Sequence, residues 1–170
     1  MFRMGRLGEF KNREAAQIGR FLESIGIAVR AGEVPEGSIL PGIRIEDGGL
    51  VVDEARLLYP GDLLHEAGHL AVLTGECRAM QGPDAGADLG NEIGAMCWSY
   101  AAAVYLQLDP AVVFHPHGYR GASESYLENF REGRYPGVPL LQWMGLTADE
   151  KNARELGVAP YPHMMRWLRE

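Results

Sequence analysis

The chain has 170 residues, of which 46% are apolar, and a formal net charge of −7. This length supplies one ordinary hydrophobic core, so we expect a single domain over residues 1–170. The acidic balance, with only two lysines, argues against a nucleic-acid partner. Residues 1–20 are charged throughout, and no apolar run could span a bilayer, so we expect neither a signal peptide nor a membrane anchor. These features predict a cytoplasmic protein.

The first part of the chain contains one helical and one strand pattern. Residues 9–25 place apolar side chains at helical spacing and are followed by Gly26, which predicts an amphipathic helix. Residues 43–53 read as two short strands around an Asp-Gly-Gly turn, which predicts a β-hairpin. This hairpin either covers the core or binds an extended substrate by adding a strand.

The next apolar segment contains the sequence His-Glu-x-x-His at residues 65–69. A loop precedes it and Asp62 can cap it, so the segment predicts a buried helix. Histidines four positions apart share a helical face at about 5–6 Å between Cβ atoms, close enough to bind one tetrahedral metal ion. Glu66 lies beside the first histidine, where it can take a proton from a bound water. The alternative is a pair of core histidines satisfied by backbone carbonyls.

Gly68 supports the metal-site interpretation. A glycine inside a helix costs about 1 kcal/mol relative to alanine, which indicates that another group approaches the backbone closely there.

A catalytic zinc needs a third protein ligand and one open position, and Glu92 is the best candidate. It stands 23 positions after His69, at the start of a helical run over residues 91–106 that ends before Asp109-Pro110. On a helical period Glu92 shares a face with small or flexible residues, namely Ala95, Met96, Ser99 and Ala103. Alternatively, Glu92 only interacts with the helix dipole, and the site is completed by Asp84, Asp88 or His115.

Residues 60–107 resemble the gluzincin group of zinc metallopeptidases, in which His-Glu-x-x-His on one helix is completed by a glutamate on the next. The resemblance implies an α+β, mostly helical, zincin-like fold with a metal-binding helix pair and a small hairpin or sheet. It also implies that Zn²⁺ is bound by His65, His69 and Glu92, with Glu66 as the general base.

The chain departs from the thermolysin-like pattern in one respect. Those members carry an aspartate four residues after the glutamate, as an outer partner of a ligand histidine, and this chain has Met96 there. Asp62, Asp88 and Ser99 are the candidates for that role. The metzincin pattern does not fit, because it requires glycine and histidine where this chain has Val72 and Gly75.

A loop at residues 113–121 follows the second helix and concentrates polar side chains. Peptide hydrolysis passes through an oxyanion, and we expect Tyr119 and His117 to donate hydrogen bonds to it. Arg120 is a candidate anchor for a substrate carboxylate. The alternative is a surface loop of ordinary polar residues.

The last part of the chain predicts packing elements. Residues 123–131 read as a short helix and 135–139 as a loop, and Thr147 with Glu150 predicts a capping box for a helix ending near Gly157. Cys77 and Cys97 are too few for a disulfide scaffold and are predicted to be free thiols, with Cys97 in the core.

The leading hypothesis from the sequence is a zinc metallopeptidase that acts on a peptide or protein substrate. Hydrolysis of another amide or of an ester is closely related chemistry. A non-catalytic, metal-stabilised binding domain is the alternative from a different class.

Overall fold

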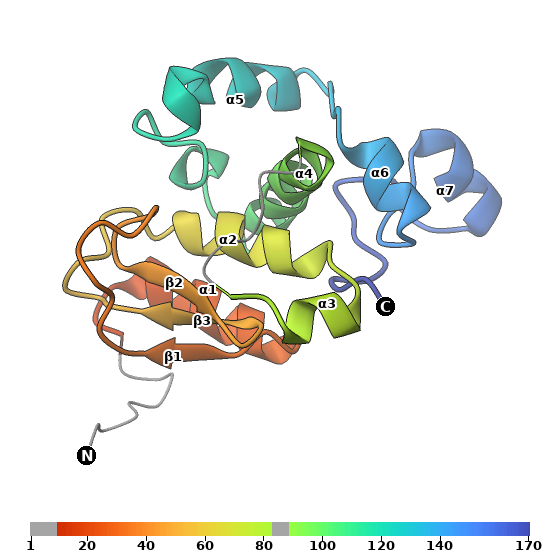
Figure 1. The fold of residues 1–170 in the computed structure, drawn as a ribbon. Helices are drawn as coiled ribbons and strands as arrows, with labels where there is room; N and C mark the ends of the chain where they lie inside the picture. Colours follow the sequence, from red (N-terminus) through yellow and green to blue (C-terminus); the bar gives the residue numbers. More distant parts are fainter. Residues whose placement is uncertain (1–9, 83–88) are drawn as a thin grey trace.

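The computed structural model describes residues 10–82 and 89–170, without the side chains of residues 89, 90 and 120 (Figure 1). Helices account for 45% of the residues and strands for 8%, which confirms the predicted α+β, mostly helical class. Helix α1 (Arg13–Ser24) confirms the predicted amphipathic helix. It begins after Asn12, whose side chain accepts a hydrogen bond from the backbone N–H of Ala15 at 3.0 Å.

A three-stranded sheet follows α1. The hairpin of β2 (Ile43–Glu46) and β3 (Gly49–Val52) confirms the prediction, and its turn places Asp47 and Gly48 at φ of 50° and 72°. Both positive values are those of a tight primed hairpin turn. Strand β1 (Val29–Ala31), which was not predicted from the sequence, pairs in parallel with β3 and makes β3 the central strand. All four residues of β3 are buried for that reason.

Helices α2 (Asp62–Ala71) and α4 (Leu89–Tyr105) form the centre of the molecule and confirm the two predicted helices. In Figure 1, α1 lies behind the sheet and α2 crosses above it, while α4 packs against α2 on the side away from the sheet. A Cβ atom added to Gly68 would lie 2.7 Å from the carbonyl oxygen of Ala95 and 3.0 Å from its Cα. The close backbone approach that Gly68 predicts is therefore present, and its partner is α4.

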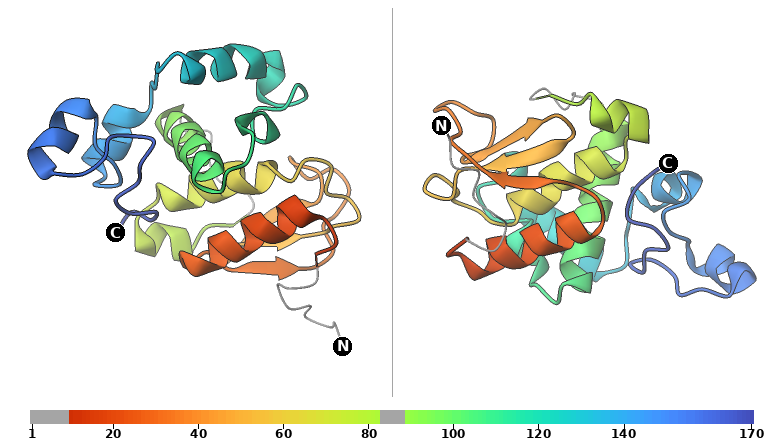
Figure 2. Two further views of the ribbon diagram at one scale, coloured as in Figure 1. Left: turned by 180° about the vertical axis from the view of Figure 1, so that it is seen from behind. Right: turned by 90° about the horizontal axis from the view of Figure 1, so that it is seen from below.

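The remaining helices are short. They are α3 (Gly75–Ala79), the 3₁₀ turns η2 (Pro110–Val112) and η3 (Tyr119–Gly121), and helices α5 (Ser123–Arg131), α6 (Val138–Trp143) and α7 (Glu150–Leu156). Figure 2 shows α5, α6 and α7 on the other side of the α2 and α4 pair from the sheet.

Helix α5 has the bounds predicted from the sequence, but two other expectations in this region are wrong. The predicted loop at 135–139 overlaps the start of α6, because Pro139 stands in the first turn of a helix, where its missing N–H is not needed. The cap of α7 is Asp149, which accepts a hydrogen bond from the Asn152 N–H at 2.8 Å. Thr147 instead donates its hydroxyl to the carbonyl of His163 at 2.6 Å.

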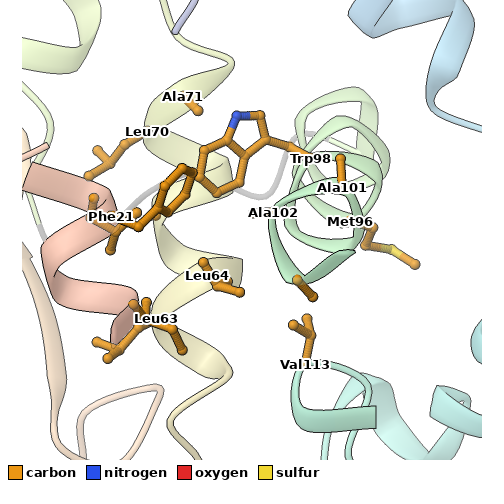
Figure 3. Close-up of a cluster of buried hydrophobic side chains, with 14 of the residues drawn as sticks. Phe21, Leu63, Leu64, Leu70, Ala71, Met96, Trp98, Ala101, Ala102 and Val113 are labelled. Carbon is orange, nitrogen blue, oxygen red and sulfur yellow. The ribbon is translucent and has the colours of Figure 1, made fainter. Parts of the chain in front are cut away.

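One cluster of buried apolar side chains joins these elements (Figure 3). Trp98 of α4 is fully buried, and its ring extends across α2 toward Phe21 of α1, with a ring-centroid distance of 6.2 Å. Cys97 is also buried, and its sulfur accepts a hydrogen bond from the backbone N–H of Gly137 at 3.2 Å. Cys97 and Cys77 are free thiols, as predicted.

The segment around Trp167 and Arg169 is tied to the end of α2. The Arg169 N–H donates to the carbonyl of Ala71 at 2.9 Å, and the Arg78 guanidinium donates to the carbonyls of Leu70, Leu73 and Arg169. The Trp98 indole N–H donates to the carbonyl of Trp167 at 2.8 Å. The carbonyls of Leu70 and Ala71, in the last turn of α2, are thus satisfied from other parts of the chain.

Within the described residues, none of the helices combines the length and the apolar character needed to cross a membrane.

The contact at Gly68 predicts a specific sensitivity to substitution. Gly68→Ala should lower the free energy of unfolding by about 1–3 kcal/mol, because the added methyl group forces the α2 and α4 backbones apart. Urea denaturation of the two proteins measures this difference.

Gly75→Ala is the matched control, since a Cβ at Gly75 would meet nothing within 4 Å. It should leave stability unchanged or raise it slightly. Equal effects of the two substitutions would contradict the packing argument.

Candidate metal centre

Two histidines of α2 face each other one helical turn apart. The Nε2 atoms of His65 and His69 are 3.1 Å apart, and their rings meet edge to face at a centroid distance of 4.7 Å. The side chain of His69 is 8% exposed and that of His65 is 15% exposed. Both imidazoles therefore present the same ring nitrogen to one partly buried point.

Glu92, in the first turn of α4, completes this cluster. One of its carboxylate oxygens lies 3.5 Å from His65 Nε2, and the other lies 3.0 Å from His69 Nε2. Two ligand atoms bound to a tetrahedral zinc at 2.0–2.1 Å are about 3.3 Å apart, so all three separations are close to the required spacing. The Glu92 side chain is 38% exposed, which leaves this side of the cluster accessible to solvent.

Glu66 stands next to the same point. One ligand-type atom from each of His65, Glu66 and His69 lies within 4.8 Å of the others, a grouping that can hold a metal ion. Glu92 fits the role of third ligand better than Glu66, because its two oxygens already contact the two Nε2 atoms. Glu66 is then left free to exchange a proton.

The pKa values of the four titratable groups in the cluster are shifted in different directions. Burial, followed by the charge of His69, lowers the pKa of His65 to about 4. Burial also acts to lower the pKa of His69, but its hydrogen bond to Glu92 and the charges of Glu66 and Glu92 outweigh burial and raise it. That same hydrogen bond lowers the pKa of Glu92. His65 therefore favours the neutral imidazole near pH 7, whereas His69 is hydrogen-bonded to Glu92.

The pKa of Glu66 is raised to about 6. Burial is the main cause, and the nearby carboxylates of Asp62 and Glu92 add to it, while His69 acts in the opposite direction. A carboxylate with a pKa near the working pH is suited to accept and return a proton.

Tyr119 contacts the cluster from η3. Its hydroxyl lies 2.8 Å from Nδ1 of His65, and its ring meets the imidazole edge to face at 5.2 Å between centroids. From the sequence we expect an oxyanion donor at this residue, whereas the structure places the hydroxyl on the edge of His65 that faces away from the Nε2 cluster. Nδ1 of His69 is buried and has no hydrogen-bond partner among the described residues.

A second buried pair lies at the start of α2. Asp62 and His115 are hydrogen-bonded at 2.8 Å, and Tyr59 stacks on the His115 ring at 3.9 Å between centroids. Burial raises the pKa of Asp62, and the contact with His115 partly offsets this effect. Asp62 therefore bonds to His115 and not to a ring nitrogen of His65 or His69.

The other predicted site residues are more remote. His117 is exposed, and its ring stacks on Tyr59 at 5.7 Å between centroids, outside the Nε2 cluster. Asp84, Asp88 and the side chain of Arg120 lie outside the described part of the chain.

Sequence reasoning missed two contacts of this site. These are the Asp62 bond to His115 and the Tyr119 bond to His65, which join residues 53 and 54 positions apart. The one local signal for Asp62 was its spacing, three positions before His65 and thus on the same face of α2. Nothing local identifies the distant partners.

Comparison of the chain with protein-family models, with curated protein sequences and with solved structures gave no match. The properties of the cluster are therefore derived from its own geometry and charge.

The opposite pKa shifts of the two histidines predict how zinc binding depends on pH. Zinc requires neutral imidazoles, and His65 already has a pKa of about 4, whereas His69 has a pKa above its ordinary 6.5. Between about pH 5 and 6.5, zinc binding to the Glu66→Gln variant, which has no carboxyl proton at residue 66 to release, should displace about one proton, from His69. The logarithm of the binding constant should rise by about one per pH unit there and level off above the pKa of His69.

Calorimetric titrations of this variant with zinc, in buffers of different ionisation enthalpy, measure the proton release. Release of two protons per zinc in the same range would show that both histidines are charged and would contradict the separation of their pKa values.

Proposed function

We propose that this protein is a zinc-dependent hydrolase in which His65, His69 and Glu92 hold the metal and Glu66 is the general base. One observation carries the proposal: two Nε2 atoms and a carboxylate from two helices converge at 3.0–3.5 Å around one point. Three ligands with one side open to solvent are typical of catalytic zinc sites, whereas structural sites usually have four protein ligands.

The fit between the residues and a cation also follows from their charge. Two carboxylates, those of Glu66 and Glu92, lie beside two imidazoles of which one has its pKa lowered to about 4. Burial without a cation raises the pKa of Glu66 and so works against its ionised form. A divalent ion would stabilise both carboxylates and use both imidazole lone pairs.

In the proposed reaction, zinc would supply Lewis acidity, lowering the pKa of a water molecule to near 7. Glu66 would accept a proton from the attacking water molecule as the oxygen of that water forms a bond to the substrate carbonyl carbon. Glu66 then returns the proton to the leaving nitrogen, so the carboxylate is regenerated and the C–N bond is broken. Glu92 does not take part in proton transfer, because its oxygens face the two ligand histidines.

We propose a peptide or protein as the substrate, and this part rests on the resemblance of residues 60–107 to gluzincin peptidases. The same chemistry applies to other amides and to esters. The two free thiols support the proposal of a reducing, cytoplasmic location.

A non-catalytic role for the metal is the second candidate. It is favoured by the burial of His69 and by the position of the cluster at the crossing of α2 and α4. A metal bound there would link the two central helices and stabilise a binding domain.

The metal centre is tested by the zinc content of purified protein. Wild type should contain one zinc per chain, and His65→Ala and Glu92→Ala should each lose most of it, because each removes one of three ligands. His163→Ala, at an exposed histidine outside the cluster, should retain it. Full zinc content in Glu92→Ala would assign the third ligand elsewhere.

Glu66→Gln separates catalysis from a structural role for the metal, because it keeps the side-chain shape and removes the base. Zinc content should stay at one per chain while turnover of a peptide-library substrate falls about 10²–10⁴-fold. Glu76→Gln, on the exposed surface of α3, is the matched control and should keep full activity.

Loss of zinc from Glu66→Gln would make Glu66 a ligand. Unchanged turnover would refute its role as base. The binding-domain alternative requires zinc binding without turnover in any of these proteins.

A further inference from the structure

We propose that Tyr119 is a positioning residue for the metal site, which fixes the ring and the tautomer of His65 through a hydrogen bond to Nδ1. This role rests on the proposed zinc site, and it differs from donation to a substrate oxyanion. In thermolysin-like sites an aspartate contacts a ligand histidine, and this chain has Met96 at the position of that aspartate. We assign the equivalent contact to the hydroxyl of Tyr119.

The hydrogen bond determines which nitrogen of His65 is free. A neutral imidazole donates through one ring nitrogen and accepts through the other. If Nδ1 donates to the Tyr119 oxygen, 2.8 Å away, then Nε2 carries the lone pair that faces His69 and Glu92. That tautomer is the one able to bind a metal at the cluster.

The proposed metal site requires this direction of donation. A metal ion at the cluster would take the Nε2 lone pair of His65, so the proton of the neutral imidazole lies on Nδ1 and is donated to the Tyr119 oxygen.

The backbone of Tyr119 is in an unusual conformation. Its φ of 53° lies in the left-handed region, which an aromatic residue rarely adopts. The ring is held there by packing against Phe114 and Tyr126, at centroid distances of 5.2 and 5.5 Å. Strained residues persist where the surroundings fix them and concentrate at functional sites, so the strain is an independent sign that this placement matters.

Tyr119→Phe tests the proposal, because it removes the hydroxyl and leaves the ring packing in place. Zinc affinity, measured by competition with a chromophoric chelator, should fall about 10–100-fold. Tyr126→Phe is the matched control: its ring packs on Tyr119, but its hydroxyl bonds to none of the described residues, and its affinity should match wild type.

A second measurement separates positioning from general stability. In the zinc-loaded wild type, proton NMR should show a slowly exchanging downfield signal from the His65 Nδ1–H, which Tyr119→Phe should remove and Tyr126→Phe should retain. Equal zinc affinity and an unchanged signal in Tyr119→Phe would overturn the role of Tyr119 alone. Absence of zinc binding in wild type would instead refute the proposed metal centre on which the role depends.

Discussion

The close approach of α2 and α4 at Gly68 is the constraint on which the candidate site depends. The histidines belong to one helix and Glu92 to the other, and a side chain at residue 68 would collide with the Ala95 backbone. The short carboxylate and imidazole side chains meet at hydrogen-bond distance because the backbones of the two helices lie this close together. The buried side chains around Trp98 pack against the same two helices, so the packing of the core also holds the geometry of the site.

Several polar groups of the candidate site are only partly compensated by their surroundings. One imidazole is forced to stay neutral, one carboxylate has its pKa raised to about 6, and a buried Nδ1 of His69 has no partner among the described residues. Proteins usually satisfy buried polar groups, and exceptions at a cluster of side chains that could hold a metal ion point to function. The hydrogen bond between His69 and Glu92 compensates only part of this cost.

The central elements could be predicted because their signals are local. The hairpin follows from its turn residues, α1 from apolar periodicity, and the pairing of His65 with His69 from helical spacing. The close contact at Gly68 could also be predicted, because a glycine destabilises the interior of a helix unless a neighbouring backbone needs the space. By contrast, β1 is three residues long and depends on β3, and the bond between Tyr119 and His65 depends on the path of the chain through η3. Such contacts are set by tertiary packing, which local patterns do not encode.

The hydrogen bonds at the end of α2 have a consequence for how the molecule is made. Arg169 donates to the carbonyls of Ala71 and Val72, and the second of these bonds joins residues 97 positions apart. During synthesis α2 therefore leaves the ribosome well before the residue that satisfies its last carbonyls. Contacts of such long sequence separation form slowly, since closing the intervening loop costs entropy first. Completion of the helix that carries both histidines is thus a late event, and a nascent chain that has not yet reached Arg169 has an unfinished α2.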